Sequence, residues 1–134
     1  MRAKTPREPY TPQAATGFPS PAEDYIDQRL DLNQLLVRNA PATFFFRVQG
    51  DSMRAAGIAS GDLLVVDRSI DAAPGHVVVA CVDGELAVKR LKRGKAGLML
   101  AAEDPASAQV LLREDSQTEL WGVATHVIHA LAKY

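Results

Sequence analysis

Two side chains in this sequence could do chemistry: the hydroxyl of the serine at position 52 as a nucleophile and the amine of the lysine at position 89 as a base. Ser52 follows the aromatic and β-branched run 43–48, where a predicted strand passes into the turn residues of Gly50-Asp51-Ser52-Met53. Reactive side chains are often carried where a rigid element positions a loop. Taken by itself, however, a serine after Gly-Asp is more often a turn residue or a helix N-cap than a nucleophile.

Lys89 lies within a predicted strand over residues 85–92. Because alternate residues of a strand face the same side, Lys89 shares a face with Ala87 and Leu91. If that face is covered, desolvation lowers the pKa of the ammonium, and a neutral lysine can accept the proton of a serine hydroxyl. The alternative, which the pattern alone favours, is that Lys89 opens to solvent with its basic neighbours as an ordinary charged strand.

The elements that must position these side chains are mostly strands. Turn residues and alternating or continuous apolar runs predict strands over 43–49, 63–67, 76–82, 85–92, 97–102, 109–112 and 119–130, with the alternative that the last divides in two. The run 76–82 is so uniformly apolar that we expect both of its faces to be covered. Asp83-Gly84 is typical of a two-residue hairpin turn.

Helix is expected in two short pieces. Asp31 is a candidate N-cap for a helix of one to two turns over residues 31–36, because the leucines that follow share one helical face. A single helical turn is predicted over 52–56, with Gly57 as its C-terminal stop. The predicted fold class is therefore mainly β, with one short helix and an extended N-terminal arm.

The composition excludes several classes of protein. The chain has 134 residues with 47% hydrophobic and 23% charged residues, which is ordinary for one globular domain. A net charge of −1 does not indicate a nucleic-acid or membrane surface, and no apolar run approaches a membrane span, so we expect a cytoplasmic protein. The only cysteine is Cys81, and His126 and His129 would face opposite sides of a strand, so no metal site and no cofactor are expected.

The N-terminal segment differs from the rest of the chain. Residues 1–24 hold five of the eight prolines and few large apolar side chains, which predicts an extended arm. We therefore expect an arm with the short helix over 1–40 and a β domain over 41–134. The arm is either a plain disordered tail or a substrate, because a protease cleft commonly accepts an extended segment as an added strand.

Three blocks in the right order resemble one family: Gly50-Asp51-Ser52-Met53, residues 57–67 and residues 84–91. Over about residues 15–134 the chain resembles the self-cleaving serine peptidases of the LexA/UmuD family, and most closely its short UmuD-like members. The resemblance implies a LexA/signal-peptidase-like β fold. It also implies that Ser52 is the nucleophile and Lys89 the general base, with the backbone N–H groups at Ser52 and Met53 holding the oxyanion.

The resemblance implies that the substrate is the chain's own arm. The matching scissile bond is Thr16–Gly17, and cleavage there leaves residues 17–134. One departure is Thr16, because the family usually has Ala or Cys before the scissile glycine and a β-branch stiffens the side chain. Cleavage would then be slow, or the bond would lie elsewhere within Ala14 to Gly17.

The resemblance also implies partners. UmuD-like proteins form homodimers, are cut with the help of a RecA filament on single-stranded DNA, and then join a Y-family, UmuC-like catalytic subunit in error-prone translesion synthesis during the SOS response. Nothing before residue 40 resembles the DNA-reading domain of a repressor. Two alternatives stay open: a catalytically silent, dimeric binding module for a polymerase or recombinase filament, and a peptidase that acts on other chains.

Overall fold

A computed structural model describes residues 29–104, 109–113 and 117–132. The predicted arm over 1–24 and the predicted scissile bond Thr16–Gly17 lie outside these residues. The chain divides into two compact units, residues 1–38 and 39–134. The predicted division at residue 40 stays a prediction, because most of the first part lies outside the described residues. No helix within the described ranges is long and apolar enough to cross a membrane.

The described part of the first unit contains one short helix, α1 (Leu32–Leu36). Its N-cap is Asp31, whose carboxylate Oδ1 accepts a hydrogen bond from the backbone N–H of Asn33 at 2.9 Å. This contact satisfies a backbone donor that has no partner within the helix. The predicted helix and its cap are therefore confirmed.

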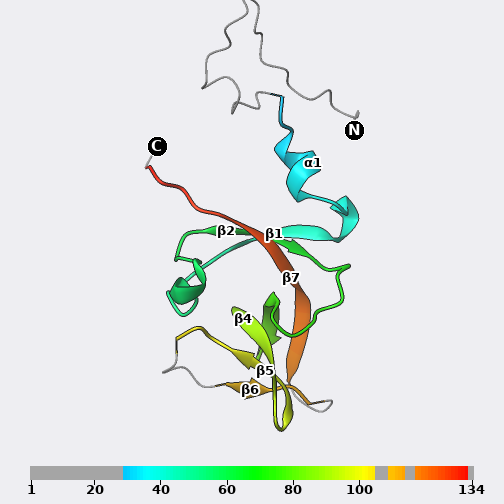
Figure 1. The fold of residues 1–134 in the computed structure, drawn as a ribbon, viewed down its shortest axis with the longest axis vertical. Coiled ribbons are helices and arrows are strands. Elements are labelled where there is room, and N and C mark those ends of the chain that lie inside the picture. Colours follow the sequence, from blue (N-terminus) through cyan, green and yellow to red (C-terminus); the bar gives the residue numbers. More distant parts are fainter. Residues whose placement is uncertain (1–28, 105–108, 114–116, 133–134) are drawn as a thin grey trace, which may run out of the picture. The chain divides into compact units, whose positions relative to one another are not determined.

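The described residues of the second unit form one antiparallel sheet of seven strands in the order β1-β2-β7-β3-β4-β5-β6 (Figure 1). The strands are β1 (Thr43–Arg47), β2 (Leu63–Asp67), β3 (Val77–Val82), β4 (Glu85–Gly94), β5 (Gly97–Ala101), β6 (Val110–Leu111) and β7 (Thr118–Ile128). Two 3-10 helices, η2 (Ala40–Ala42) and η3 (Arg54–Ala56), flank β1 in the sequence. The prediction of a mainly β fold with one short α-helix is confirmed.

Strand β3 is buried on both faces, as its continuous apolar run predicts. Val78, Val79 and Ala80 are each 0% exposed. Val79 belongs to a core cluster with Met53, while Val78 and Ala80 belong to a second cluster with Leu91. Neighbouring side chains of a strand point to opposite faces, so the sheet carries a core on each side and β3 crosses both.

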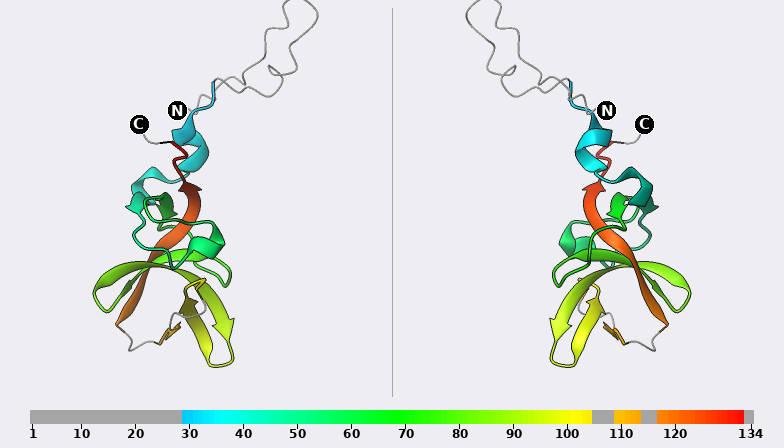
Figure 2. Two further views of the ribbon diagram at one scale, coloured as in Figure 1. Left: turned by 90° about the vertical axis from the view of Figure 1, so that its left-hand side faces the viewer. Right: turned by 90° about the vertical axis from the view of Figure 1, so that its right-hand side faces the viewer.

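Strand β7 is continuous, so the alternative of two separate strands is wrong. Its register shifts against β2 between Val65 and Val66 and against β3 between Val79 and Ala80. Such bulges bend and twist a strand without ending it. In the two side views, β7 (orange) accordingly curves along its length without a break (Figure 2).

The hairpin between β3 and β4 sets the register of Lys89. Asp83 and Gly84 both have positive φ angles, 51° and 86°, as a type I′ turn requires. This confirms the predicted two-residue hairpin and pairs Lys89 with Val78 across the ladder. Lys89 therefore lies on the same face as Leu91, as the alternation along the strand predicts.

Candidate functional site

Hydrogen bonds connect the two ends of the loop that carries Ser52. It leaves β1 after Arg47 and returns to β2 at Leu63. Hydrogen bonds that close it include Val48 N–H to the Asp62 carbonyl at 2.9 Å, Gly61 N–H to the Val48 carbonyl at 2.8 Å, and Gly50 N–H to Ser60 Oγ at 3.1 Å. These contacts hold the segment before Ser52 against the segment that returns to the sheet.

The residues after Ser52 anchor the loop from the other side. Met53 is 2% exposed and belongs to the core cluster that contains Val79. The predicted helical turn is present as the 3-10 helix η3, and Gly57 ends it with a left-handed φ of 84°. Ser52 is therefore held between a closed loop and a buried side chain.

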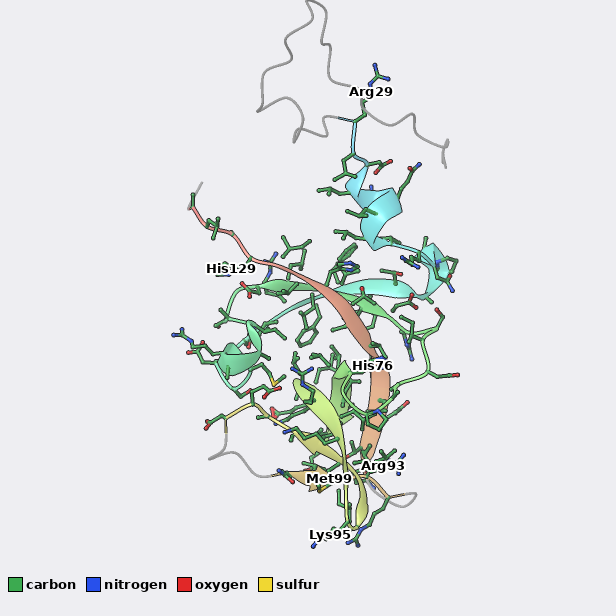
Figure 3. The ribbon with its side chains drawn as sticks, in the orientation of Figure 1. Arg29, His76, Arg93, Lys95, Met99 and His129 are labelled. Atoms are coloured by element: carbon green, nitrogen blue, oxygen red, sulfur yellow. The ribbon has the colours of Figure 1, made fainter. Side chains whose placement is uncertain are left out.

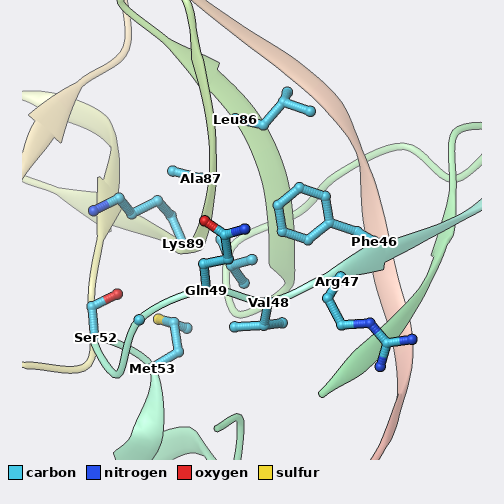
Figure 4. A pocket seen from close by; sticks show the side chains of 11 residues that line it. Phe46, Arg47, Val48, Gln49, Ser52, Met53, Leu86, Ala87 and Lys89 are labelled. Carbon is cyan, nitrogen blue, oxygen red and sulfur yellow. The ribbon is translucent and has the colours of Figure 1, made fainter. Parts of the chain in front are cut away.

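Ser52 and Lys89 line the same pocket, which has a volume of about 320 Å³. Both side chains are half-buried, and they lie at the same end of the pocket (Figure 4). Ser52 comes from the loop after β1 and Lys89 from β4. The lining is formed by Phe46, Arg47, Val48, Gln49, Gly50, Ser52, Met53, Leu86, Ala87, Val88 and Lys89.

The reactive atoms of this pocket are not engaged elsewhere in the described part of the chain. Neither Ser52 Oγ nor Lys89 Nζ takes part in a hydrogen bond or ion pair there, and the two are not hydrogen-bonded to each other. None of the described residues that line the pocket is an aspartate or a glutamate. The backbone N–H groups of Ser52 and Met53 also donate to no acceptor among these residues, so they are available to an oxyanion.

One edge of β4 is open beside Lys89. Strand β3 pairs with β4 from Glu85 to Arg90, but β5 pairs with it only from Arg90 to Gly94. Within the described residues, the other edge of Glu85–Lys89 therefore has no partner strand. A free strand edge presents backbone donors and acceptors to which an extended peptide can add. The pocket thus combines a serine, a lysine and a place for a peptide strand.

Asp62 and His129 form a pair that the sequence did not reveal. Asp62 is 3% exposed, and its carboxylate accepts from the Ala59 N–H at 2.8 Å and from His129 Nδ1 at 2.5 Å. The hydrogen bond from Ala59 is the main cause that lowers the pKa of Asp62; burial opposes it and His129 reinforces it. His129 lies just past the end of β7 and beside β2 (Figure 3).

The histidines do not form a metal site in the described part of the chain. His126 Nδ1 lies 3.0 Å from the Thr125 hydroxyl, whereas His129 binds Asp62. Among the described residues no group of three or more histidine, cysteine, aspartate or glutamate side chains could hold a metal ion.

Comparisons with known proteins agree on one family. Residues 9–125 match the family described as peptidase S24-like. Protein ImpA of Escherichia coli is 42% identical over 120 residues, 90% of this chain and 81% of ImpA. Protein MucA of Escherichia coli is 40% identical over 117 residues, 87% of this chain and 80% of MucA. LexA repressor 1 of Xanthomonas campestris is 39% identical over 115 residues, which cover 86% of this chain and 57% of the repressor.

Proposed function

Because the chain belongs to the peptidase S24-like family, as a UmuD-like member, we propose that it cleaves itself with Ser52 as nucleophile and Lys89 as general base. The observation that carries the proposal is that these two side chains, from separate elements, line one pocket in which neither has another partner among the described residues. A serine and a neutral lysine are sufficient for acyl transfer without a histidine.

The proposed reaction has two stages. The neutral amine of Lys89 takes the proton of Ser52 Oγ, which attacks the carbonyl carbon of residue 16, and the backbone N–H groups of Ser52 and Met53 stabilise the oxyanion. The peptide C–N bond then breaks, and the Lys89 ammonium gives its proton to the departing amine of Gly17. A water molecule, activated by the same lysine, hydrolyses the acyl ester and restores the free Ser52 hydroxyl.

The free edge of β4 supports a substrate that binds as a strand. An added strand would run past Lys89 and bring one of its carbonyl groups to the pocket that holds Ser52. The absence of a side chain at Gly17 would allow its backbone to approach the serine closely. We therefore keep Thr16–Gly17 as the proposed scissile bond.

We propose that the processed chain, residues 17–134, forms a homodimer that serves as an accessory subunit of an error-prone translesion DNA polymerase in the SOS response. The catalytic partner would be a Y-family, UmuC-like subunit, and a RecA filament on single-stranded DNA would promote the cut. Membership of the UmuD-like group supports this role. No cofactor is needed for it.

The test is the intact mass of the purified protein after incubation at about pH 10, near the ordinary pKa of a lysine. The parent is compared with Ser52→Ala, Lys89→Ala and the control Lys92→Ala, which removes an exposed lysine from the same strand. We expect a product that begins at Gly17 in the parent and in Lys92→Ala only. If none of the folded proteins is cut, the catalytically silent binding module takes the place of the peptidase.

A further inference from the structure

A chain of polar contacts links the strand of Lys89 to the backbone of Ser52. The next residue on β4, Arg90, donates from Nε to Glu103 Oε1 at 2.8 Å. The residue after Glu103, Asp104, donates its backbone N–H to the Ser52 carbonyl at 3.1 Å. Lys89 is thus the chain neighbour of Arg90, and Ser52 is hydrogen-bonded to Asp104, the chain neighbour of Glu103, so the Arg90–Glu103 ion pair lies between the two proposed catalytic residues.

Arg90 is also fixed from its other side. Its Nη1 atom donates to the Gly75 carbonyl at 2.8 Å, while the Gly75 N–H donates to the Leu91 carbonyl at 2.7 Å. One guanidinium therefore contacts the turn before β3 and the segment after β5 together. A planar fork with several donors can make both contacts, whereas a lysine ammonium has no such fixed geometry.

The ion pair between Arg90 and Glu103 is partly buried, so it can fix the relative position of the two segments that carry it. The side chains of Arg90 and Glu103 are only 28% and 21% exposed. Charge-assisted hydrogen bonds of this length are stronger than neutral ones, and solvent screens a half-buried pair less than an exposed one. By contrast, the ion pair between Arg54 and Asp51, in the loop that carries Ser52, has an N–O distance of 3.5 Å. Its side chains are 73% and 60% exposed, so little stabilisation is expected from it.

We propose that Arg90 and Glu103 are positioning residues for the Ser52–Lys89 reaction. They hold the segment that binds the Ser52 carbonyl at a fixed distance from the strand that carries Lys89. The proposal rests on the proposed self-cleavage. Neither side chain lines the pocket, so they act through the backbone of Ser52 and through β4. A displacement of about 1 Å in such a site can cost roughly a hundredfold in rate.

The experiment is a double-mutant cycle on the full chain with Arg90→Gln, Glu103→Gln and both changes together. The rate of self-cleavage is measured by intact mass from about pH 8 to pH 11, a range that spans the ordinary pKa of lysine. The matched control is Arg93→Gln, an exposed arginine of the same strand that lies nearer the β4–β5 hairpin (Figure 3) and has no partner among the described residues.

We expect each single variant to lower the rate at the high-pH plateau by about tenfold to a hundredfold. The double variant should be no slower than the slower single variant, because both changes break the same link. Arg93→Gln should stay within about twofold of the parent. If Arg90→Gln does not fold, Arg90→Lys is used instead. Lysine keeps the positive charge but cannot make both guanidinium hydrogen bonds, so slower cleavage is again expected.

Three results would overturn the positioning role. The first is a plateau rate of self-cleavage that is unchanged in folded single variants, and the second is a double variant in which the two rate effects simply add. The third is an unchanged plateau rate with the midpoint of the pH–rate curve shifted in opposite directions by Arg90→Gln and Glu103→Gln. The last result would indicate a field effect of the two charges on Lys89. Labelling of Ser52 by a fluorophosphonate separates this from failure of the proposed function. If the parent is neither cut nor labelled, both proposals fail; if variants are labelled as fast as the parent, only the positioning role fails.

Discussion

Replacing Asp62 by asparagine should destabilise the β domain, and the loss should disappear in acid. Asp62→Asn keeps the shape of the side chain but removes the charge from a carboxylate that is 3% exposed. That carboxylate accepts one hydrogen bond from the Ala59 N–H and one from His129. The carbonyl of the same residue accepts from Val48 and closes the loop that carries Ser52.

The size of the effect follows from these two contacts. Hydrogen bonds to a charged group contribute about 1.5–3 kcal/mol each and neutral ones about 0.5–1.5 kcal/mol. An asparagine can still accept one of the two bonds, and His129 is about half exposed, at 52%, so its share is screened by solvent. We therefore expect the free energy of unfolding to fall by about 1–3 kcal/mol at neutral pH.

The pH dependence has a definite sign. The pKa of Asp62 in the folded protein lies below its ordinary value of 3.8, chiefly because of the hydrogen bond from Ala59. The carboxylate therefore contributes its full stabilisation above the unfolded-state pKa and loses it as the pH falls through the folded-state pKa. The difference in unfolding free energy between parent and Asp62→Asn should therefore shrink as the pH falls below about 4.

The assay is urea unfolding followed by the fluorescence of Trp121, the only tryptophan, in a Ser52→Ala background that removes the proposed nucleophile. The control is Asp71→Asn, which removes an exposed carboxylate without a partner among the described residues and should change stability by less than about 0.5 kcal/mol. A difference for Asp62→Asn that persists unchanged at pH 3, or that grows there, would refute the argument from the charged carboxylate.

Two further substitutions follow from the sequence and the packing. Thr16→Ala should speed alkaline self-cleavage, because it removes the β-branch next to the proposed scissile bond; a mass time course that shows an equal or slower rate would contradict this. Gly122→Ala should lower the free energy of unfolding by about 1–3 kcal/mol in the same urea assay, because backbone and core must shift. Its added Cβ would lie 2.7 Å from Val66 Cγ1 and 3.2 Å from the Asp67 carbonyl, so unchanged stability would show that β7 can move at this point.

Much of the fold could be predicted because its signals are local. The turn Asp83-Gly84 requires positive φ angles that few residues adopt, and it sets the register of β3 and β4. The unbroken apolar run in β3 predicts burial on both faces. Asp31 caps α1 through a hydrogen bond two residues away. The LexA/UmuD resemblance rests on three short blocks, each of which can be recognised locally, and the match of residues 9–125 to the peptidase S24-like family confirms it.

The contacts that support the candidate site could not be predicted, because they join distant parts of the chain. His129 meets Asp62 only because β7 lies beside β2, and Glu103 meets Arg90 only because β5 returns along β4. No periodicity in the sequence encodes such a pairing. The continuity of β7 could not be predicted either. Its bulges opposite Val65 and Val79 bend the strand without interrupting it, and the sequence does not indicate where such bulges occur.

The side chains of the two members of the proposed dyad differ in how firmly the structure fixes them, and we expect the less fixed one to move during the proposed reaction. The backbone of Ser52 is fixed by the hydrogen bond from Asp104, by the closed loop before it and by the buried side chain of Met53 after it. Lys89 has a fixed backbone on β4, but its amine ends a flexible four-carbon stem with no partner among the described residues. If Ser52 and Lys89 act as the proposed dyad, we therefore expect the hydrogen bond between them to form by a rotation of the Lys89 side chain toward Ser52. A peptide strand on the open edge of β4 would favour this rotation, because it displaces the water that otherwise solvates the amine.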